Sequence, residues 1–169
     1  MDGKDIAAFV GAVENVFGTM IQVHVDVGKP RLKQPGDPRF DVSAIIGLSG
    51  DVAGAVVLSF PVETAESVVA LLIGQQVSSD DHDFADAIGE MANMVTGNAK
   101  AELADRSISI SCPSVVVGDG HKVFQQKGRA LVEIPFECEC GPFVVEVTMQ
   151  PTTSEDAAPA QPAEAPAAS

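Results

Sequence analysis

Four residues between positions 86 and 97 could together bind and position a reacting molecule. On a helix, which advances about 100° per residue, all four fall within about 60° of one another: Asp86, Glu90, Asn93 and Gly97. The steps of four and three residues make Asp86, Glu90 and Asn93 neighbours on one face. Carboxylates can pair with cations, and an amide has no useful pKa but can hold a water molecule through its carbonyl and NH₂ groups. The pattern therefore favours the positioning of water and charge.

The opposite side of the same helix is expected to face the core. The apolar residues there repeat at helical spacing: Phe84, Ile88, Met91, Val95 and Ala99. The simplest interpretation of the polar side is an ordinary solvent-exposed face. Asn93 and Gly97 argue against it, because both are poorer helix formers than Ala, Glu or Lys, and Gly costs about 1 kcal/mol. The small residues Gly89, Ala92 and Gly97 would also let another backbone approach this face closely.

Other catalytic and metal-binding patterns are incomplete. Gly47, Gly50 and Gly54 lack the Gly-Lys-Ser/Thr continuation of a phosphate loop. Ser49 does not stand in the Gly-x-Ser-x-Gly turn of a nucleophilic serine. The aspartates within 80–86 lack the spacing of an EF-hand, and we expect them to cap and complement the start of a helix. The sequence therefore predicts no metal site.

The composition excludes several classes of partner. Among 169 residues there are 24 acidic and 10 basic side chains, a net charge of −14, which would repel nucleic acids and anionic membrane surfaces. No stretch approaches the roughly 20 apolar residues of a membrane span, and the first residues do not resemble a secretory leader. The three cysteines, an odd number that suits a reducing compartment, are expected to be buried thiols: Cys112, Cys138 and Cys140. We therefore expect a cytoplasmic protein.

The periodicity of apolar residues predicts the elements that would position the candidate helix. The expected helices are residues 5–18, a segment ending near Gly74, and a long helix at about 80–106. The expected strands are residues 22–27, a hairpin over 40–61, and a run within 107–150 with turns at 118–120, 127–128 and 141–142. The Gly and Pro content of residues 28–38 predicts a loop. This order predicts an α+β fold with helices against an antiparallel sheet.

The last 19 residues differ in composition from the rest of the chain. Residues 151–169 are rich in Ala and Pro and contain three acids, no bases and no large apolar side chain. Such a segment cannot bury a core, and its prolines favour extended chain. We therefore predict one domain over residues 1–150 and a disordered acidic tail over 151–169.

Residues 86–100 resemble the active-site helix of the CheX/CheC family of chemotaxis phosphatases. The segment reads D-A-I-G-E-M-A-N-M-V-T-G-N-A-K. The family shows a small acidic or hydroxyl residue, then Glu four positions on, then Asn three further. Further segments are similar to the family in the same order, at 45–60, 113–120 and 140–149. The resemblance covers residues 1–150 and implies the CheC-like fold, with one long active-site helix.

This resemblance implies a function and a role for each candidate residue. The substrate would be the aspartyl phosphate of a CheY-type response regulator in chemotaxis or two-component signalling. Asn93 would orient the attacking water, and Glu90 would pair with a lysine of the regulator. Asp86 and Gly97 would belong to the partner-binding surface, as would Pro113, the candidate for a proline that the family places beyond the Asn. The regulator would supply the acyl phosphate and Mg²⁺, so the enzyme would need no cofactor of its own.

CheC-type members carry the Glu/Asn motif on two helices, and this chain departs from that pattern. The predicted second helix has Glu66 but Val69 where Asn would stand. One site makes the chain more similar to CheX, which implies a homodimer, and the apolar strands within 107–150 could pair through exposed edges. The alternative is a non-catalytic CheC-like binding or assembly module related to flagellar-switch proteins, because a fold can outlive its chemistry.

Overall fold

The structure is a computed structural model, and it describes residues 1–34, 37, 40–118, 121 and 130–152. The helices are α1 (Gly3–Val16), the π-helical turn η1 (Phe17–Ile21), α2 (Val62–Ile73) and α3 (His82–Glu102). The strands of the first half are β1 (Val25–Val27), β2 (Arg31–Leu32), β3 (Val42–Gly50) and β4 (Val52–Phe60). Those of the second half are β5 (Ile108–Ile110), β6 (Ser114–Val117), β7 (Val132–Cys138) and β8 (Gly141–Pro151).

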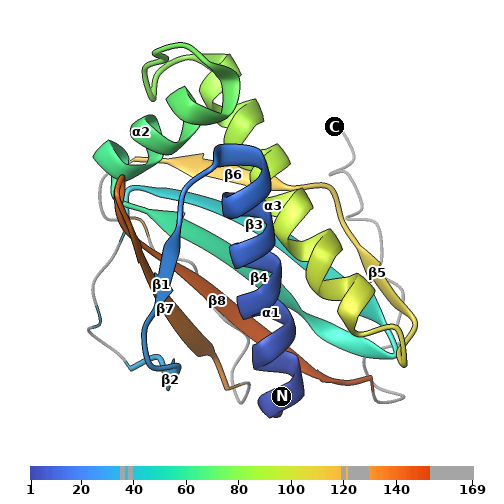
Figure 1. Ribbon diagram of the computed structural model, residues 1–169. Coiled ribbons are helices and arrows are strands. Elements are labelled where there is room, and N and C mark those ends of the chain that lie inside the picture. The colour runs from blue at the N-terminus through green and yellow to red at the C-terminus, as the bar shows by residue number, and fades with distance from the viewer. Residues whose placement is uncertain (35–36, 38–39, 119–120, 122–129, 153–169) are drawn as a thin grey trace, which may run out of the picture.

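All eight strands form one antiparallel sheet. Its order is β1-β7-β8-β4-β3-β5, with β2 also paired to β7 and β6 also paired to β3. The central strands are nine to eleven residues long and alternate apolar side chains toward one face. The helices α1 and α3 lie side by side across that face, and α2 sits at one end of it (Figure 1). The predicted α+β fold with an antiparallel sheet is therefore confirmed.

The hydrophobic core lies between the sheet and the helices. Four phenylalanines form a stacked group at its centre, in which the Phe143 ring lies 4.6 Å from Phe17, 5.3 Å from Phe60 and 5.2 Å from Phe136. Phe17 opens η1, so this turn carries an aromatic ring from the end of α1 onto the sheet. Among the described residues, no helix combines the length and the apolar composition that crossing a bilayer requires.

Several predicted boundaries need correction. The strand expected at 22–27 is formed only by Val25–Val27, because Gln22 adopts a left-handed conformation (φ 62°) at the end of η1. The loop expected at 28–38 contains the short strand β2, which pairs with a strand about 100 residues later. The turn expected at 141–142 lies at Glu139 and Cys140, and Gly141 already opens β8. The turn expected at 127–128 lies outside the described residues.

The hairpin, the second helix and the long helix agree with their predictions. β3 and β4 pair from Val42↔Phe60 to Leu48↔Gly54 and reverse at Gly50 and Asp51. α2 ends at Gly74, whose left-handed conformation (φ 77°) is the usual end of a helix. α3 spans 21 residues, His82–Glu102, and ends about four residues before the predicted limit at 106.

Candidate functional site

The candidate residues lie on α3, and the sequence around them explains why this helix forms. The Asp81 carboxylate caps the helix by accepting a hydrogen bond from the Asp83 backbone amide at 3.0 Å. Asp83 in the first turn and Lys100 in the last complement the helix dipole. The predicted apolar stripe is buried throughout: Phe84, Ile88, Met91, Val95 and Ala99. The structure therefore confirms which side of α3 faces the core.

The polar side of α3 has the predicted orientation. Asp86 and Glu90 are exposed, and Asn93 and Gly97 are half-buried. The Glu90 and Asn93 side chains form no hydrogen bond or ion pair with any other described residue. Their carboxylate and amide groups therefore remain available to a molecule that approaches this side of the helix.

Asp86 differs from Glu90 because it has a partner within the chain. One of its carboxylate oxygens lies 3.1 Å from His82 Nδ1, one turn earlier on the helix. Both side chains are largely exposed, so this pair contributes little to stability. Sequence analysis did not single out His82, although its spacing of four residues from Asp86 was a usable signal.

The fold brings Pro113 to the candidate helix. A Cβ atom at Gly89 would lie 3.2 Å from Pro113 Cγ, so Pro113 borders α3 directly before Glu90. Gly89 and Ala92 were expected on the accessible side, and this prediction is wrong because both are buried. The atoms that approach Gly89 are side-chain atoms of Pro113 and Val115, from the same chain. Only Gly97 faces open space, with nothing within 4 Å of a Cβ atom built on it.

Three side chains at the start of α3 could in geometric terms hold a cation. His82, Asp83 and Asp86 each offer one ligand atom, and these atoms lie within 4.8 Å of one another. All three residues are exposed, and the helix dipole places partial positive charge at this end. The aspartates at the start of α3 were expected to cap the helix and to complement its dipole. Asp81 and Asp83 have these two roles.

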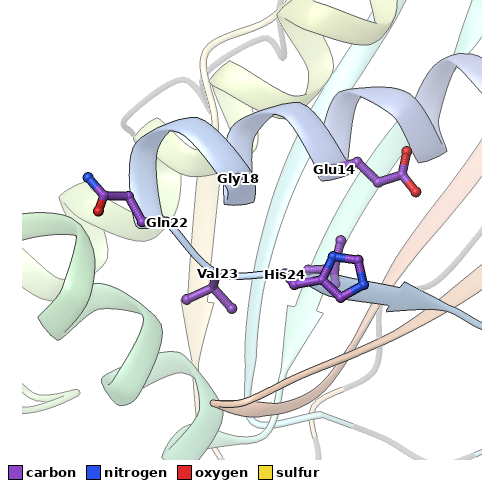
Figure 2. Close-up of a pocket in the computed structure, with 6 residues that line it drawn as sticks. Glu14, Gly18, Gln22, Val23 and His24 are labelled. Atoms are coloured by element: carbon purple, nitrogen blue, oxygen red, sulfur yellow. The ribbon is translucent and has the colours of Figure 1, made fainter.

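A hollow elsewhere on the surface is separate from this group of residues. It lies between the end of α1, η1 and the start of β1 (Figure 2). Glu14, Gly18, Gln22 and His24 are among its lining residues, and none of the predicted site residues belongs to it.

The cysteines required a correction. Cys112 is exposed, and Cys138 and Cys140 are half-buried, so the prediction of three buried thiols is wrong. Desolvation and the neighbouring Cys138 raise the pKa of Cys140 to about 11. Such a thiol is protonated near neutral pH and is a poor nucleophile.

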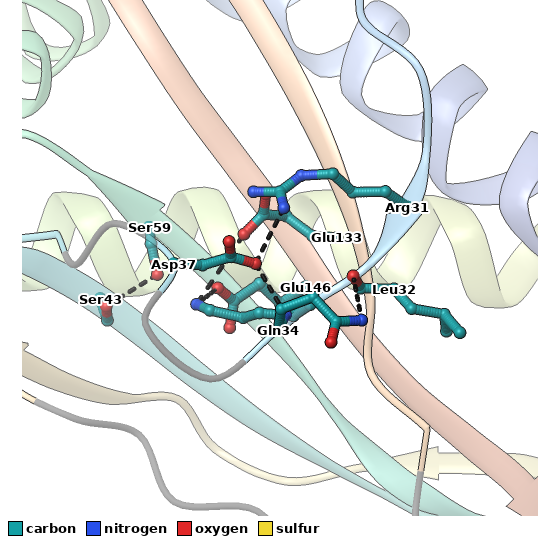
Figure 3. Close-up of polar contacts among 9 residues, drawn as sticks. Arg31, Leu32, Gln34, Asp37, Ser43, Ser59, Glu133 and Glu146 are labelled. Carbon is teal, nitrogen blue, oxygen red and sulfur yellow. Dashed lines mark hydrogen bonds and ion pairs between the residues drawn. The ribbon is translucent and has the colours of Figure 1, made fainter.

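A second polar cluster lies on the face of the sheet opposite the helices (Figure 3). Glu133 on β7 and Glu146 on β8 stand directly opposite each other and are 3% and 4% exposed. Arg31 binds Glu133 at 2.6 Å and Asp37 at 2.8 Å, and Lys33 binds Glu146 and lies 3.9 Å from Glu133. Burial raises the pKa of Glu146, and the hydrogen bond from Lys33 opposes this shift. We call these five residues the sheet cluster.

A family model and a curated relative both relate this chain to CheX. Residues 42–137 match the family described as chemotaxis phosphatase CheX. The chain is also similar to the CheY-P phosphatase CheX of Thermotoga maritima. The two are 29% identical over 126 residues, which cover 73% of this chain and 81% of the relative.

Two crystal structures extend this similarity to three dimensions. The chemotaxis protein CheX from Desulfovibrio desulfuricans is 32% identical with a TM-score of 0.80, over 86% of this chain and 99% of that one. A complex of CheX with CheY, BeF₃ and Mg²⁺ from Borrelia burgdorferi contains a chain that is 26% identical. Its TM-score is 0.72, and the match covers 86% of this chain and 97% of that one.

Proposed function

Because this chain belongs to the CheX family of chemotaxis phosphatases, we propose that it hydrolyses the aspartyl phosphate of a CheY-type response regulator. The observation that supports this most directly is the pair of unpartnered side chains on α3. Glu90 is exposed and Asn93 is half-buried on the same side of the helix, and neither is engaged by another described residue. Buried polar groups are usually hydrogen-bonded within the chain, whereas these two side chains are free to bind a molecule outside it.

In this proposal Asn93 orients the water that attacks the phosphorus atom. The amide cannot act as a general base, but its carbonyl can accept a hydrogen bond from water while its NH₂ group donates to a phosphoryl oxygen. Phosphoryl transfer requires alignment of nucleophile and leaving group more than covalent participation of the enzyme. The half-buried setting of Asn93 supports this role, because a restrained amide loses less entropy when it positions a water.

Glu90 has a different role in the proposal. Its exposed carboxylate would pair with a lysine of the regulator and so fix the regulator's orientation on α3. Asp86, Gly97 and Pro113 would border the same surface. The regulator would bring the phosphoryl group and Mg²⁺, consistent with the composition of the related complex from Borrelia burgdorferi.

The direct test is the release of phosphate from purified phosphorylated response regulators with and without this protein. We expect catalytic amounts of the protein to accelerate release from at least one regulator of the same organism. Binding of the phosphorylated regulator without accelerated release would contradict the proposal. It would instead favour the alternative function, a non-catalytic binding or assembly module of the same fold.

We also propose that the protein forms a homodimer, which membership of the family suggests. The outer strand β6 supports this with Val116 and Val117, which are 37% and 42% exposed. An exposed apolar edge strand is suited to pairing with another chain. Sedimentation equilibrium at micromolar concentration should give twice the monomer mass of 17.5 kDa, and a monomer would refute the proposal.

A further inference from the structure

Gly89 lies in α3 directly before Glu90, and the absence of a side chain there allows Pro113 to pack closely against the helix. A Cβ atom there would lie 3.2 Å from Pro113 Cγ, 3.4 Å from Val115 Cγ2 and 3.6 Å from Pro113 Cβ. The first distance is shorter than ordinary van der Waals contact, so an alanine would require a neighbour to move by a few tenths of an ångström. Segment 111–115 therefore lies closer to α3 than a larger residue would allow without a shift.

The other side of this segment is bound to the sheet. The Ser111 amide donates to the Gly47 carbonyl at 3.0 Å, and the Gly47 amide donates to Ser111 Oγ at 2.9 Å. Ser111 Oγ in turn donates to the Cys112 carbonyl at 2.8 Å. From Ser114 onward the chain pairs with β3 as strand β6. Segment 111–115 is thus held between β3 and α3, with limited room to retreat from the helix.

The other glycines of α1 and α3, two helices that lie wholly within the described residues, do not share this property. Cβ atoms built on Gly3, Gly11 and Gly97 would meet nothing within 4 Å. Glycine is also unfavourable inside a helix. The close contact with Pro113 gives a physical reason for a glycine at position 89 that helix formation alone does not.

We propose that Gly89 is a positioning residue for the phosphatase site, an inference that rests on the proposed function of Glu90 and Asn93. Because Gly89 allows Pro113 to pack against α3, it fixes segment 111–115 at a set distance from those two side chains. The helix and the segment then form one continuous docking surface for the phosphorylated regulator. Gly89 itself does not touch the substrate, because it is buried against Pro113 and Val115 of its own chain.

The test compares Gly89→Ala with Gly11→Ala, the same substitution in an open position of α1. Gly89→Ala should displace Pro113 and lower kcat/KM for the phosphorylated regulator about three- to tenfold, because a misplacement of about 1 Å can cost roughly 100-fold. The loss should appear in KM, since Asn93 keeps its place on α3. Gly11→Ala should leave both constants unchanged and raise Tm slightly through its better helix propensity.

A double-mutant cycle with Pro113→Ala separates positioning from a general loss of stability. Removal of Pro113 Cγ eliminates the shortest contact, so Gly89→Ala should cost much less in the Pro113→Ala background. The proposal would be overturned if Gly89→Ala lowered kcat/KM as much in the Pro113→Ala background as in wild type. It would also be overturned if Gly89→Ala had the same KM as the wild-type protein.

Amide hydrogen exchange supplies a readout that does not depend on catalysis. The Ser111 amide should exchange faster in Gly89→Ala than in wild type, and at the wild-type rate in Gly11→Ala. Unchanged exchange in Gly89→Ala would refute the positioning role even in an active enzyme. Failure of the wild-type protein to release phosphate would instead refute the proposed function, and the exchange rates would still decide whether Gly89 positions the segment.

Discussion

Carboxylates occur in two contrasting settings in this protein. On α3, Glu90 points to solvent and has no partner among the described residues. In the sheet cluster, Glu133 and Glu146 are almost completely buried and are satisfied by Arg31 and Lys33. The cost of burying a charge explains the second setting, because an unpaired carboxylate there would be strongly destabilising.

The contrast indicates which polar groups serve folding and which are available for function. The sheet cluster connects residues more than 100 positions apart and fastens the segment that contains β2 to the sheet. The Glu90 and Asn93 side chains on α3 bind no other described residue. We therefore expect substitutions in the sheet cluster to change stability, and substitutions on α3 to change activity or binding.

The largest effect is expected for Asn93→Ala. Loss of one polar group positioned for the transition state typically lowers the rate about 10²- to 10³-fold, or about 3–4 kcal/mol. Turnover of the phosphorylated regulator should fall by this factor, while its affinity and the Tm of the variant stay near wild type. Wild-type turnover would contradict the role of Asn93.

Asn98→Ala provides the matched control on the same helix. Asn98 is engaged within the chain, where it accepts from Asn15 and donates to the Met94 carbonyl, each at 2.8 Å. Its substitution should lower Tm modestly and leave turnover intact, the reverse of the pattern for Asn93→Ala.

The next largest effect is expected for Lys33→Met, which keeps most of the length of the side chain and removes its charge. Two buried carboxylates would then face each other with Arg31 as their remaining cation, which should cost about 3 kcal/mol of unfolding free energy. Urea unfolding measures this loss, and turnover should not change. Lys29→Met is the control, because Lys29 is exposed in the same segment.

The deficit of Lys33→Met should also depend on pH. Burial raises the pKa of Glu146 above its ordinary value of 4.5 in the folded protein. A raised folded-state pKa means that this group's contribution is fully present below pH 4.5 and is lost as the pH rises through the folded value. The stability difference between Lys33→Met and wild type should therefore be small in acid and grow toward neutral pH. A difference that is constant with pH would show that Glu146 does not titrate as described.

A smaller effect is expected for Glu90→Ala. Loss of a docking ion pair should weaken binding of the phosphorylated regulator about tenfold, or about 1.4 kcal/mol, with kcat largely retained. Salt should reduce the difference from wild type, because it screens exposed charges. Glu102→Ala removes an exposed carboxylate near the end of the same helix and should bind normally. A loss of binding equal to that of Glu90→Ala would indicate a general effect of charge.

The smallest effect is expected from removing the chain after residue 152. The Thr152 amide donates to the Asp51 carbonyl at 3.0 Å and its hydroxyl to the Gly50 carbonyl at 2.6 Å. Truncation after residue 152 should leave Tm and turnover unchanged, because the segment removed has no large apolar residue. Truncation after residue 150 removes those two bonds and should lower stability by about 1–2 kcal/mol. Calorimetry of both variants distinguishes a domain that ends at 150 from one that ends at 152.

The errors in the predicted strand and turn boundaries have a common cause. The strand at Val25–Val27, the pair Arg31–Leu32 and the turn at Glu139 and Cys140 are all set by pairing with β7 or β8. Their local sequences carry weak or ambiguous signals, and the partner strand decides where pairing begins. The burial of Gly89 was missed for the same reason, since the chain that covers it comes from 24 residues later.

Features that depend on neighbours within about four residues follow from the amino-acid sequence. These include the helical period of α3, its capping by an aspartate at its start, the side on which Glu90 and Asn93 stand, and the turn between β3 and β4. Two other features became evident only from the three-dimensional fold: Pro113 borders α3 at Gly89, and Glu133 lies opposite Glu146. Such pairings join segments that are remote in the chain, and they follow from strand register and helix packing, which no local pattern specifies.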